Sequence, residues 1–492
     1  MRYFIKPVIL VFFLLTACAP AEPDTVSLMI VNVSVINPVD GKILKNKDVI
    51  ISAGKISAIR PHSVKYTPDA TLLDGTGKFL VPGLIDGHVH TGTIAGLSFA
   101  QSEKYPELTK AYFAQQPRSF LYFGFTTVVD LNGNQESFDR FEKEEIHPDL
   151  FNCGQALILE DGYPAVFVPR EARQYIFPNQ LYDPRIKNHT PGITQKHNTV
   201  KNAVQKVKDN GGICVKTFHE DGFSKSIWPV PTAEMLARIR AESTRQNLPL
   251  LIHANSYDST RAAVIAGTDA VAHGLWNWDQ FADEKQLPRE LMGILDQMIA
   301  RNVAQMGSLQ TIAGLRDLFD DSYLNRPQVA TVLPPAYLDQ LKRPEGNWYR
   351  DDLISGYPTN MNDDDIVRRL DNVLSHGQQA QKYFYDHGGR VLFGSDTPSG
   401  PLATNIPGYN GYLELSRMAD TGLSLPDILK SATITNARFF GLDKKYGTVE
   451  VGKLANLLLM SKNPLETIEA YDAIDQIILH GQVIDRASLK AK

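Results

Sequence analysis

Two histidines separated by one valine end the segment GLIDGHVH, Gly83–His90. Side chains at positions i and i+2 of a β-strand point to the same face, so His88 and His90 converge while Val89 points away. Two neutral imidazoles directed at one point suit a divalent metal ion. The alternative is a pair of buried histidines that only satisfy hydrogen bonds, and these two residues alone do not decide between the two.

Further groups that bind or influence metals stand at the ends of other apolar runs: Lys216 in ICVKTF, His253 in LLIHAN, His273 in DAVAHG and Asp396 in RVLFGSDT. The carboxyl ends of the strands in a β/α barrel face one rim, so this pattern predicts that the side chains meet at an active site. Each has a structural alternative. His253 is then a core histidine, His273 and Asp396 cap strand–loop junctions, and Lys216 extends toward solvent.

The texture of the sequence divides the chain into β-rich ends and a β/α middle. Residues 26–81 and the segments YGTVEVGKLANLLLM and IDQIILHGQVI near the carboxyl terminus have the pattern of short strands. Between them, short apolar runs alternate with helical stretches such as residues 232–246 and 259–266. The runs expected as barrel strands are the segment ending in His90, TTVVDL, ALILE, ICVKTF, LPLLIHA, DAVAHG, NVAQM and RVLFGSD.

This alternation predicts an α/β fold, a (β/α)8 barrel of the TIM type, with a small β-sandwich domain formed by both termini. We expect the barrel over residues 83–441 and the composite β-sandwich over residues 26–82 and 442–492. The stretch near residues 309–362 bears Pro and Asp and has no regular periodicity. We expect it to be an irregular connection after the seventh strand that forms a lid or a substrate wall. Residues 425–440 have a helical pattern.

The amino terminus has the features of a secretory signal. Arg2 and Lys6 precede an apolar run from Val8 to Leu15 that is too short to span a bilayer. The tetrapeptide LTAC that ends at Cys18 resembles the lipobox of bacterial lipoproteins. We therefore expect a signal peptide over residues 1–18, lipidation of Cys18 and a tether over residues 19–25. By this resemblance the protein faces the periplasm from the cell envelope, and Ala19 favours the outer membrane. The alternative is an ordinary secretory signal.

Composition and charge exclude one class of partner and set an expectation for the thiols. The net charge of −5 comes with no basic tract, which argues against nucleic acid as a partner. Cys153 and Cys214 lie in apolar surroundings, and we expect two buried free thiols, although an oxidising compartment permits a disulfide. The sequence leaves the formation of homo-oligomers open.

The order HxH, Lys, His, His, Asp on successive strands resembles the amidohydrolase superfamily of metal-dependent barrels. The segments DGTGKFLVPGLIDGHVH, GFTTVVDLNG and SATITNARFFGLDKKYGTVEVGKLANLLLM are similar to its imidazolonepropionase-like and prolidase-like branch, the Xaa-Pro dipeptidases. The resemblance covers nearly the whole chain after the signal. It implies a hydrolase that cleaves an amide-type C–N bond of a small molecule, such as a dipeptide or an N-acyl amino acid.

The resemblance also implies a metal centre. His88, His90 and Asp396 hold one Zn²⁺ ion, and His253 and His273 hold a second, with other divalent metals as alternatives. Lys216, when carbamylated, bridges the two ions. Asp396 is the expected general base and then general acid. The alternative within enzymes is a mononuclear cyclic-amide hydrolase or deaminase in which Lys216 is unmodified. An alternative of another class is an inactive, lipid-anchored binding protein.

The substrate is less well defined, because two segments depart from the prolidase-like pattern. Val129 stands where an Arg is expected, and ILEDGYPAVF stands where a Gly-Gly-His turn is expected. Aromatic residues just beyond strand ends, Tyr163, Trp276 and Trp278, are candidates to line a site for an apolar or ring-shaped substrate. His219 and Glu220 either serve the pocket or lie in a solvated loop.

Overall fold

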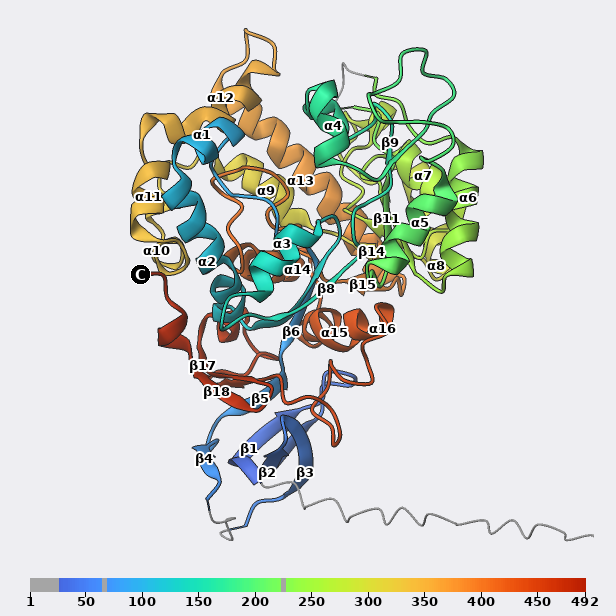
Figure 1. Cartoon of the computed structure of the whole chain (residues 1–492). Coiled ribbons are helices and arrows are strands. Elements are labelled where there is room, and N and C mark those ends of the chain that lie inside the picture. Colours follow the sequence, from blue (N-terminus) through green and yellow to red (C-terminus); the bar gives the residue numbers. More distant parts are fainter. Residues whose placement is uncertain (1–25, 64–68, 223–226) are drawn as a thin grey trace, which may run out of the picture.

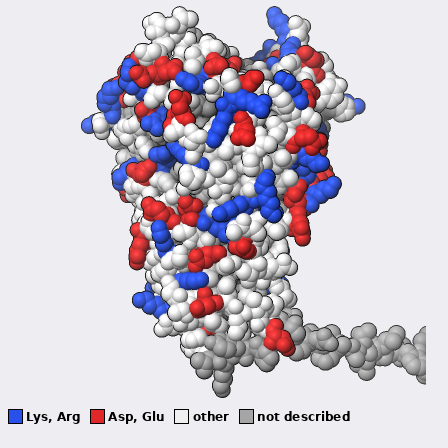
Figure 2. Space-filling model, turned by 90° about the vertical axis from the view of Figure 1, so that its left-hand side faces the viewer, with Lys and Arg blue, Asp and Glu red and all other residues white. Residues whose placement is uncertain are grey.

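The computed structural model describes residues 26–63, 69–222 and 227–492. The predicted signal peptide, the tether and Cys18 lie outside these residues. Within them, no helix combines the length and the apolar character that crossing a bilayer requires. On the face shown in Figure 2, acidic and basic side chains are interspersed and form no extended patch of one sign.

Strands from both ends of the chain pair in one sheet, at the bottom of Figure 1. Its strands are β1 (Val26–Ile36), β2 (Ile43–Ser52), β3 (Lys55–Pro61), β4 (Thr71–Asp74), β5 (Phe79–Pro82), β16 (Leu457–Met460), β17 (Ile474–Leu479) and β18 (Gln482–Asp485). They form an eight-stranded mixed sheet in the order β18-β17-β16-β5-β1-β2-β3, with β4 against β1. Because β5 pairs antiparallel with β16, the amino-terminal and carboxyl-terminal strands belong to one hydrogen-bonded sheet. The sequence analysis had predicted a β-sandwich for these two segments.

The middle of the chain supplies two parallel sheets, β6-β7-β8 and β11-β12-β13-β14-β15. The strands are β6 (Leu84–Val89), β7 (Phe125–Asp130), β8 (Asp149–Asn152), β11 (Val215–Phe218), β12 (Leu250–His253), β13 (Ala270–Ala272), β14 (Ala304–Met306) and β15 (Val391–Leu392). Nearly all their residues are buried, as expected for parallel strands covered on both faces. Gly87 permits the close approach of β6 and β15, because a Cβ there would lie 2.8 Å from the carbonyl oxygen of Phe393.

Helices cover these strands (Figure 1). They are α1 (Phe99–Lys104), α2 (Pro106–Tyr122), α3 (Gln135–Glu142), α4 (Arg170–Ile176), α5 (Val200–Asp209), α6 (Ala233–Arg245), α7 (Tyr257–Ala266), α8 (Arg289–Ala300), α9 (Leu309–Asp317), α10 (Pro327–Val332), α11 (Pro335–Leu341), α12 (Trp348–Ser355), α13 (Asp363–Asp386), α14 (Tyr409–Asp420), α15 (Leu425–Lys430) and α16 (Asn436–Phe439). The helix predicted over residues 232–246 is α6, with Thr232 as its N-cap. The helical stretch predicted over residues 259–266 lies within α7. The helical prediction over residues 425–440 corresponds to α15 and α16 joined by a π-helical turn.

Hydrogen bonds join the two parallel sheets to each other at both seams. At one seam, Val89 bridges Thr397 beyond β15, and the His90 amide donates to the Thr397 carbonyl at 2.9 Å. At the other, the Ile213 amide donates to the Asn152 carbonyl at 2.8 Å. The fold is thus α/β with parallel strands, but the ladders do not form one uninterrupted closed barrel.

The third parallel position is divided between β8, which pairs with β7, and the predicted segment ALILE, which lies beside β11. Within ALILE, Leu157 forms a parallel bridge with Thr217 of β11, and β9 (Ile158–Leu159) pairs with β10 (Gln180–Leu181) in a separate two-stranded sheet. The residues of β8 are half-buried, so the sequence DLFN lacks the apolar run that marks the other strands. The prediction at ALILE therefore missed β8 but correctly placed the segment next to the parallel strand β11.

Cys153 and Cys214 form a disulfide, so the expectation of two free thiols was wrong. Cys153 directly follows β8 and Cys214 directly precedes β11, with their Cα atoms 4.6 Å apart. The hydrogen bond at this seam brings the two segments side by side, which the separation of 61 residues conceals in the sequence. The disulfide links the edges of the two parallel sheets.

The connection after the seventh parallel strand, β14, is helical, so its prediction as irregular was wrong. It contains α9, α10, α11 and α12, the last near the top of Figure 1. Pro327 and Pro335 each occupy the first position of a helix, where a missing amide hydrogen costs nothing. The prolines that made the segment look irregular in sequence therefore begin helices.

Candidate metal centre

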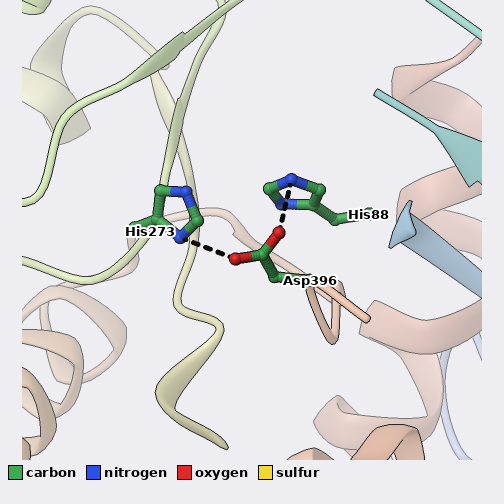
Figure 3. A group of neighbouring side chains, drawn as sticks. All are labelled: His88, His273 and Asp396. Atoms are coloured by element: carbon green, nitrogen blue, oxygen red, sulfur yellow. Dashed lines mark ion pairs between the residues drawn. The ribbon is translucent and has the colours of Figure 1, made fainter. Parts of the chain in front are cut away.

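His88 and His90 come from the carboxyl end of β6 and approach the same carboxylate. Nε2 of His88 lies 3.0 Å, and Nε2 of His90 lies 2.9 Å, from Oδ1 of Asp396, which follows β15. Two strands whose sequences lie 306 residues apart thus meet at one oxygen atom. Figure 3 shows the carboxylate of Asp396 between His88 and His273. The i, i+2 spacing does place both imidazoles on one face of the strand.

His273 and His253 complete the cluster from the neighbouring strands. Nδ1 of His273 lies 3.8 Å from Oδ2 of Asp396, and the ring centroids of His253 and His273 are 4.4 Å apart. Donor atoms of His88, His273 and Asp396 all lie within 4.8 Å of one another. His273 (φ +93°) and Asp396 (φ +52°) both have left-handed backbones, an unfavourable conformation that is tolerated where the surroundings fix a side chain.

Lys216 lies in the middle of β11, next to β12. Only 1% of the residue is exposed, and within the described residues its Nζ has no hydrogen-bond partner. Burial lowers the pKa of Lys216 to about 7. The sequence-based alternative that Lys216 extends into solvent is therefore wrong.

The electrostatics of the cluster favour imidazoles that present lone pairs. Burial, together with the nearby charge of Lys216, holds the pKa of His88 well below its usual value. Burial and His253 do the same for the pKa of His273. Burial opposes the charged form of His90 as well, but the carboxylates of Asp396 and Asp130 outweigh it and raise its pKa. Nδ1 of both His88 and His273 is buried without a hydrogen-bond partner among the described residues, and so remains available to a ligand.

Three buried carboxylates support these histidines: Asp86 and Asp130, which the sequence analysis did not assign, and Glu220, for which it left two alternatives. Asp86 accepts hydrogen bonds from the amides of His88 (3.1 Å) and Ser395 (3.0 Å), which ties β6 to the segment that carries Asp396. Burial raises the pKa of Asp86 to about 7. Asp130, at the end of β7, lies 4.0 Å from Nδ1 of His90.

Glu220 is the third of these carboxylates, and it faces His253. Its Oε2 lies 3.4 Å from Nε2 of His253, and 2% of the residue is exposed, which excludes the solvated-loop alternative. An Nε2–H group directed at Glu220 leaves the Nδ1 lone pair of His253 for a metal, the arrangement in which a carboxylate orients a metal-binding imidazole. The sequence held one signal, the position of Glu220 just beyond the strand that carries Lys216.

Of the aromatic residues proposed to line the substrate site, two lie beside the histidine cluster and one does not. The Tyr163 ring lies 4.9 Å from that of His253 and also contacts Phe218 and Trp228. The Trp276 ring lies 5.3 Å from that of His273. Trp278 is fully buried against His376, at 3.7 Å between ring centroids, so its prediction as a site-lining residue was wrong.

His219 is directed at α7. Its Nδ1 lies 3.0 Å from the hydroxyl oxygen of Ser259, and its amide donates to the His253 carbonyl at 2.9 Å. Burial lowers the pKa of His219. Through its backbone, His219 holds the strand end that carries His253.

The donor set matches the chemistry of a divalent transition metal. Imidazole nitrogens with a single carboxylate suit zinc and similar ions. Imidazole nitrogens and a buried amine that lack hydrogen-bond partners among the described residues are otherwise costly in a protein interior, since each has lost its water. The side chains present thus fit a metal centre.

Comparisons with known proteins agree with this fold. The model of the amidohydrolase family matches residues 79–484. An Xaa-Pro dipeptidase structure with bound methionine aligns at 18% identity with a TM-score of 0.64, over 93% of this chain and 99% of that one. Ochratoxinase from A. niger aligns at 18% identity with a TM-score of 0.66, over 94% and 96%.

Curated relatives match over short segments only. A segment of 88 residues is 33% identical to an adenine deaminase of Chelativorans, and one of 63 residues is 49% identical to a dihydroorotase of Pelotomaculum thermopropionicum. The first match covers 18% of this chain and the second 13%, and each spans 14% of the relative's length. At 18% identity, the two solved structures establish the fold alone.

Proposed function

The chain belongs to the amidohydrolase family and is a hydrolase of carbon–nitrogen bonds, and on that premise we propose that the cluster around Asp396 is a metal centre that hydrolyses an amide-type bond of a small molecule. The observation that carries the proposal is the convergence of His88, His90 and His273 on one buried carboxylate from separate strands. We also infer that the two parallel sheets close as a (β/α)8 barrel, supported by the hydrogen bonds at both seams.

Asp396 is the group placed to move protons. When bound, a divalent metal supplies Lewis-acid polarisation of the substrate carbonyl and acidifies a water molecule. His88 and His90 hold Oδ1 of Asp396, which leaves Oδ2 on the side of His273. From there the carboxylate accepts a proton from the attacking water and returns it to the leaving amine, acting first as general base and then as general acid.

The metal is Zn²⁺ in this proposal, and two occupancies remain as alternatives. With a carbamate on the buried Nζ of Lys216, two ions would be held, one by His88, His90 and Asp396 and the other by His253 and His273, and the carbamate would contribute oxygen ligands. With Lys216 unmodified, a single ion would be held by His88, His273 and Asp396, whose donor atoms lie within 4.8 Å of one another.

An aromatic wall beside His253 supports a substrate with an apolar or ring-shaped group. Tyr163 stacks on Trp228 at 5.7 Å between ring centroids and contacts Phe218 at 5.6 Å. Dipeptides and N-acyl amino acids with such a group are the first class to test. A cyclic-amide hydrolase or a deaminase is the second candidate, favoured by the segments shared with dihydroorotase and adenine deaminase. An inactive binding protein is disfavoured, because the complete donor set is present.

A screen with parallel metal analysis tests the proposal. Full-length protein loaded with zinc is assayed against N-acyl amino acids, dipeptides, cyclic amides and adenine, while elemental analysis counts the ions per chain. Two ions per chain with amide hydrolysis supports the carbamate alternative, and one ion supports the mononuclear alternative. Protein that binds no divalent metal contradicts the proposed centre.

The lipid anchor on Cys18 is a separate proposal that rests on the LTAC tetrapeptide. We expect the protein expressed in bacteria to incorporate labelled palmitate and to enter the detergent phase of a phase-separation assay. The Cys18→Ala variant is expected to do neither. Palmitate labelling that persists in this variant contradicts the assignment.

A further inference from the structure

A cavity of about 370 Å³ lies at the opposite end of the strands that carry the histidines and Asp396. Pro249, Asp269, Val303 and Arg390 line it, and each directly precedes one of the strands β12, β13, β14 and β15. Since all four strands are parallel, their amino ends meet at this cavity as their carboxyl ends meet at the metal centre. The cavity is therefore distinct from the candidate active site.

Three arginines from separate segments line this cavity: Arg301 after α8, Arg390 before β15 and Arg438 in α16. In the described part of the chain, none of them forms an ion pair with a carboxylate. Asp269 is the one acid among the lining residues, and it is already engaged by the guanidinium of Arg240 and by the Leu250 amide at 2.7 Å. The cavity thus carries an excess of positive charge.

Hydrogen bonds to backbone carbonyls use only some of the N–H donors of these guanidinium groups. Arg301 donates to the carbonyl of Val264 at 3.0 Å, and Arg390 donates to that of Asn302 at 2.9 Å. Each arginine has five N–H donors, so most remain unused. Nε of Arg390 is buried without a hydrogen-bond partner among the described residues, a costly state for a cationic donor unless a ligand satisfies it. Burial also lowers the pKa of Arg390.

We propose that this cavity binds a small dianionic oxyanion, such as a phosphate group or a pair of carboxylates. Guanidinium groups match the geometry of such oxyanions with paired N–H···O bonds, and three of them from different segments line this one cavity. The bound anion connects the starts of four strands with α16, so it stabilises the folded state through linkage. The proposal does not depend on the reaction at the metal centre.

Calorimetric titration of metal-loaded, full-length protein with inorganic phosphate, at constant ionic strength, tests the site. We expect one phosphate per chain and a rise in melting temperature. We expect Arg438→Ala and Arg390→Gln to weaken binding about tenfold or more, since each removes charge-assisted hydrogen bonds. Arg238→Ala, an exposed arginine on α6, is the matched control and keeps the affinity of the unmodified protein.

Two further measurements show where phosphate binds and which anions the site accepts. Phosphate that binds at the metal centre loses affinity in Asp396→Asn and not in Arg438→Ala, and this result overturns the proposal. So does the absence of binding, or competition by chloride as strong as that by phosphate. Competition by succinate identifies paired carboxylates as ligands, and its absence restricts the site to phosphate groups. Arg438 is exposed, so its variant decides the question even where Arg390→Gln does not fold.

Discussion

The two ends of the same parallel strands use charge in opposite ways. At the carboxyl ends, His88, His273 and Asp396 are buried within reach of one another, and Nδ1 of both histidines has no hydrogen-bond partner in the described part of the chain. At the amino ends, Arg301 and Arg390 partly satisfy their guanidinium groups on carbonyls at the ends of helices. The carboxyl ends gather lone pairs that can bind a cation, and the amino ends present N–H groups that can bind an anion.

The chain direction explains this difference. Each helix runs back across the strands, so its last turn, with free carbonyls and the negative end of its dipole, lies at the amino end of the next strand. Cations are therefore favoured there. The carboxyl ends lead into connections that differ in length, and these connections are free to carry residues chosen for chemistry.

The largest expected effect concerns Asp396. The Asp396→Asn variant keeps the shape of the side chain but removes the carboxylate that moves protons, so we expect turnover to fall by about 10²- to 10⁴-fold. Circular dichroism should report an intact fold. Asp371→Asn, which changes a half-exposed carboxylate on α13, is the control and should leave turnover unchanged. Full activity in Asp396→Asn would remove the proposed role.

Glu220 gives the next largest effect. Glu220→Gln keeps the size of the side chain but weakens the acceptor for Nε2 of His253, so we expect metal affinity to fall by about 10- to 100-fold. Competition with a chelator measures this directly, without reference to turnover. The exposed Glu234 on α6 supplies the matched control, Glu234→Gln. Equal metal affinity in both variants would show that Glu220 does not orient His253.

The disulfide between Cys153 and Cys214 joins the two parallel sheets at one seam, and we expect it to contribute to the stability of the whole fold. Replacing both cysteines with serine opens a loop of 61 residues, and we expect the free energy of unfolding to fall by about 2–5 kcal/mol. Urea unfolding measures the loss, and reductant should mimic it in the unmodified protein. Identical urea midpoints with and without reductant would argue that the disulfide contributes nothing to stability.

Glu414 on α14 predicts a smaller effect, a dependence of stability on pH. Its Oε2 accepts a hydrogen bond from the backbone amide of Gln310 at 2.7 Å. Burial raises the pKa of Glu414 from 4.5 to about 7. Because the folded carboxyl binds its proton more tightly than the unfolded one, its contribution is complete below the unfolded pKa and is lost as the pH rises through about 7.

Unfolding of Glu414→Gln checks this expectation. The neutral amide cannot ionise, so the variant should lose less stability than the unmodified protein between about pH 5 and about pH 8. The exposed Glu290 on α8 provides Glu290→Gln as a control that keeps the original slope. A steeper decline in Glu414→Gln than in the unmodified protein would reverse the sign and contradict the assignment.

Several features were accessible from single segments of the sequence. The spacing in HVH requires both imidazoles on one strand face, and the apolar runs that contain Lys216 or lead to His253 and His273 mark buried parallel strands. The third strand, β8, was missed because its residues are only half-buried. The helices after β14 were missed because prolines at helix starts look, in sequence, like prolines in loops.

The sequence by itself determined which side chains stand at the strand ends, because that depends on local periodicity alone. Only the tertiary structure decided which distant segments become neighbours. It paired Cys153 with Cys214, buried Glu220 against His253 and gathered three arginines at the amino ends of four strands. The physical reason is that contacts between segments depend on the stagger and closure of the sheets, and residue order along the chain does not encode these quantities locally.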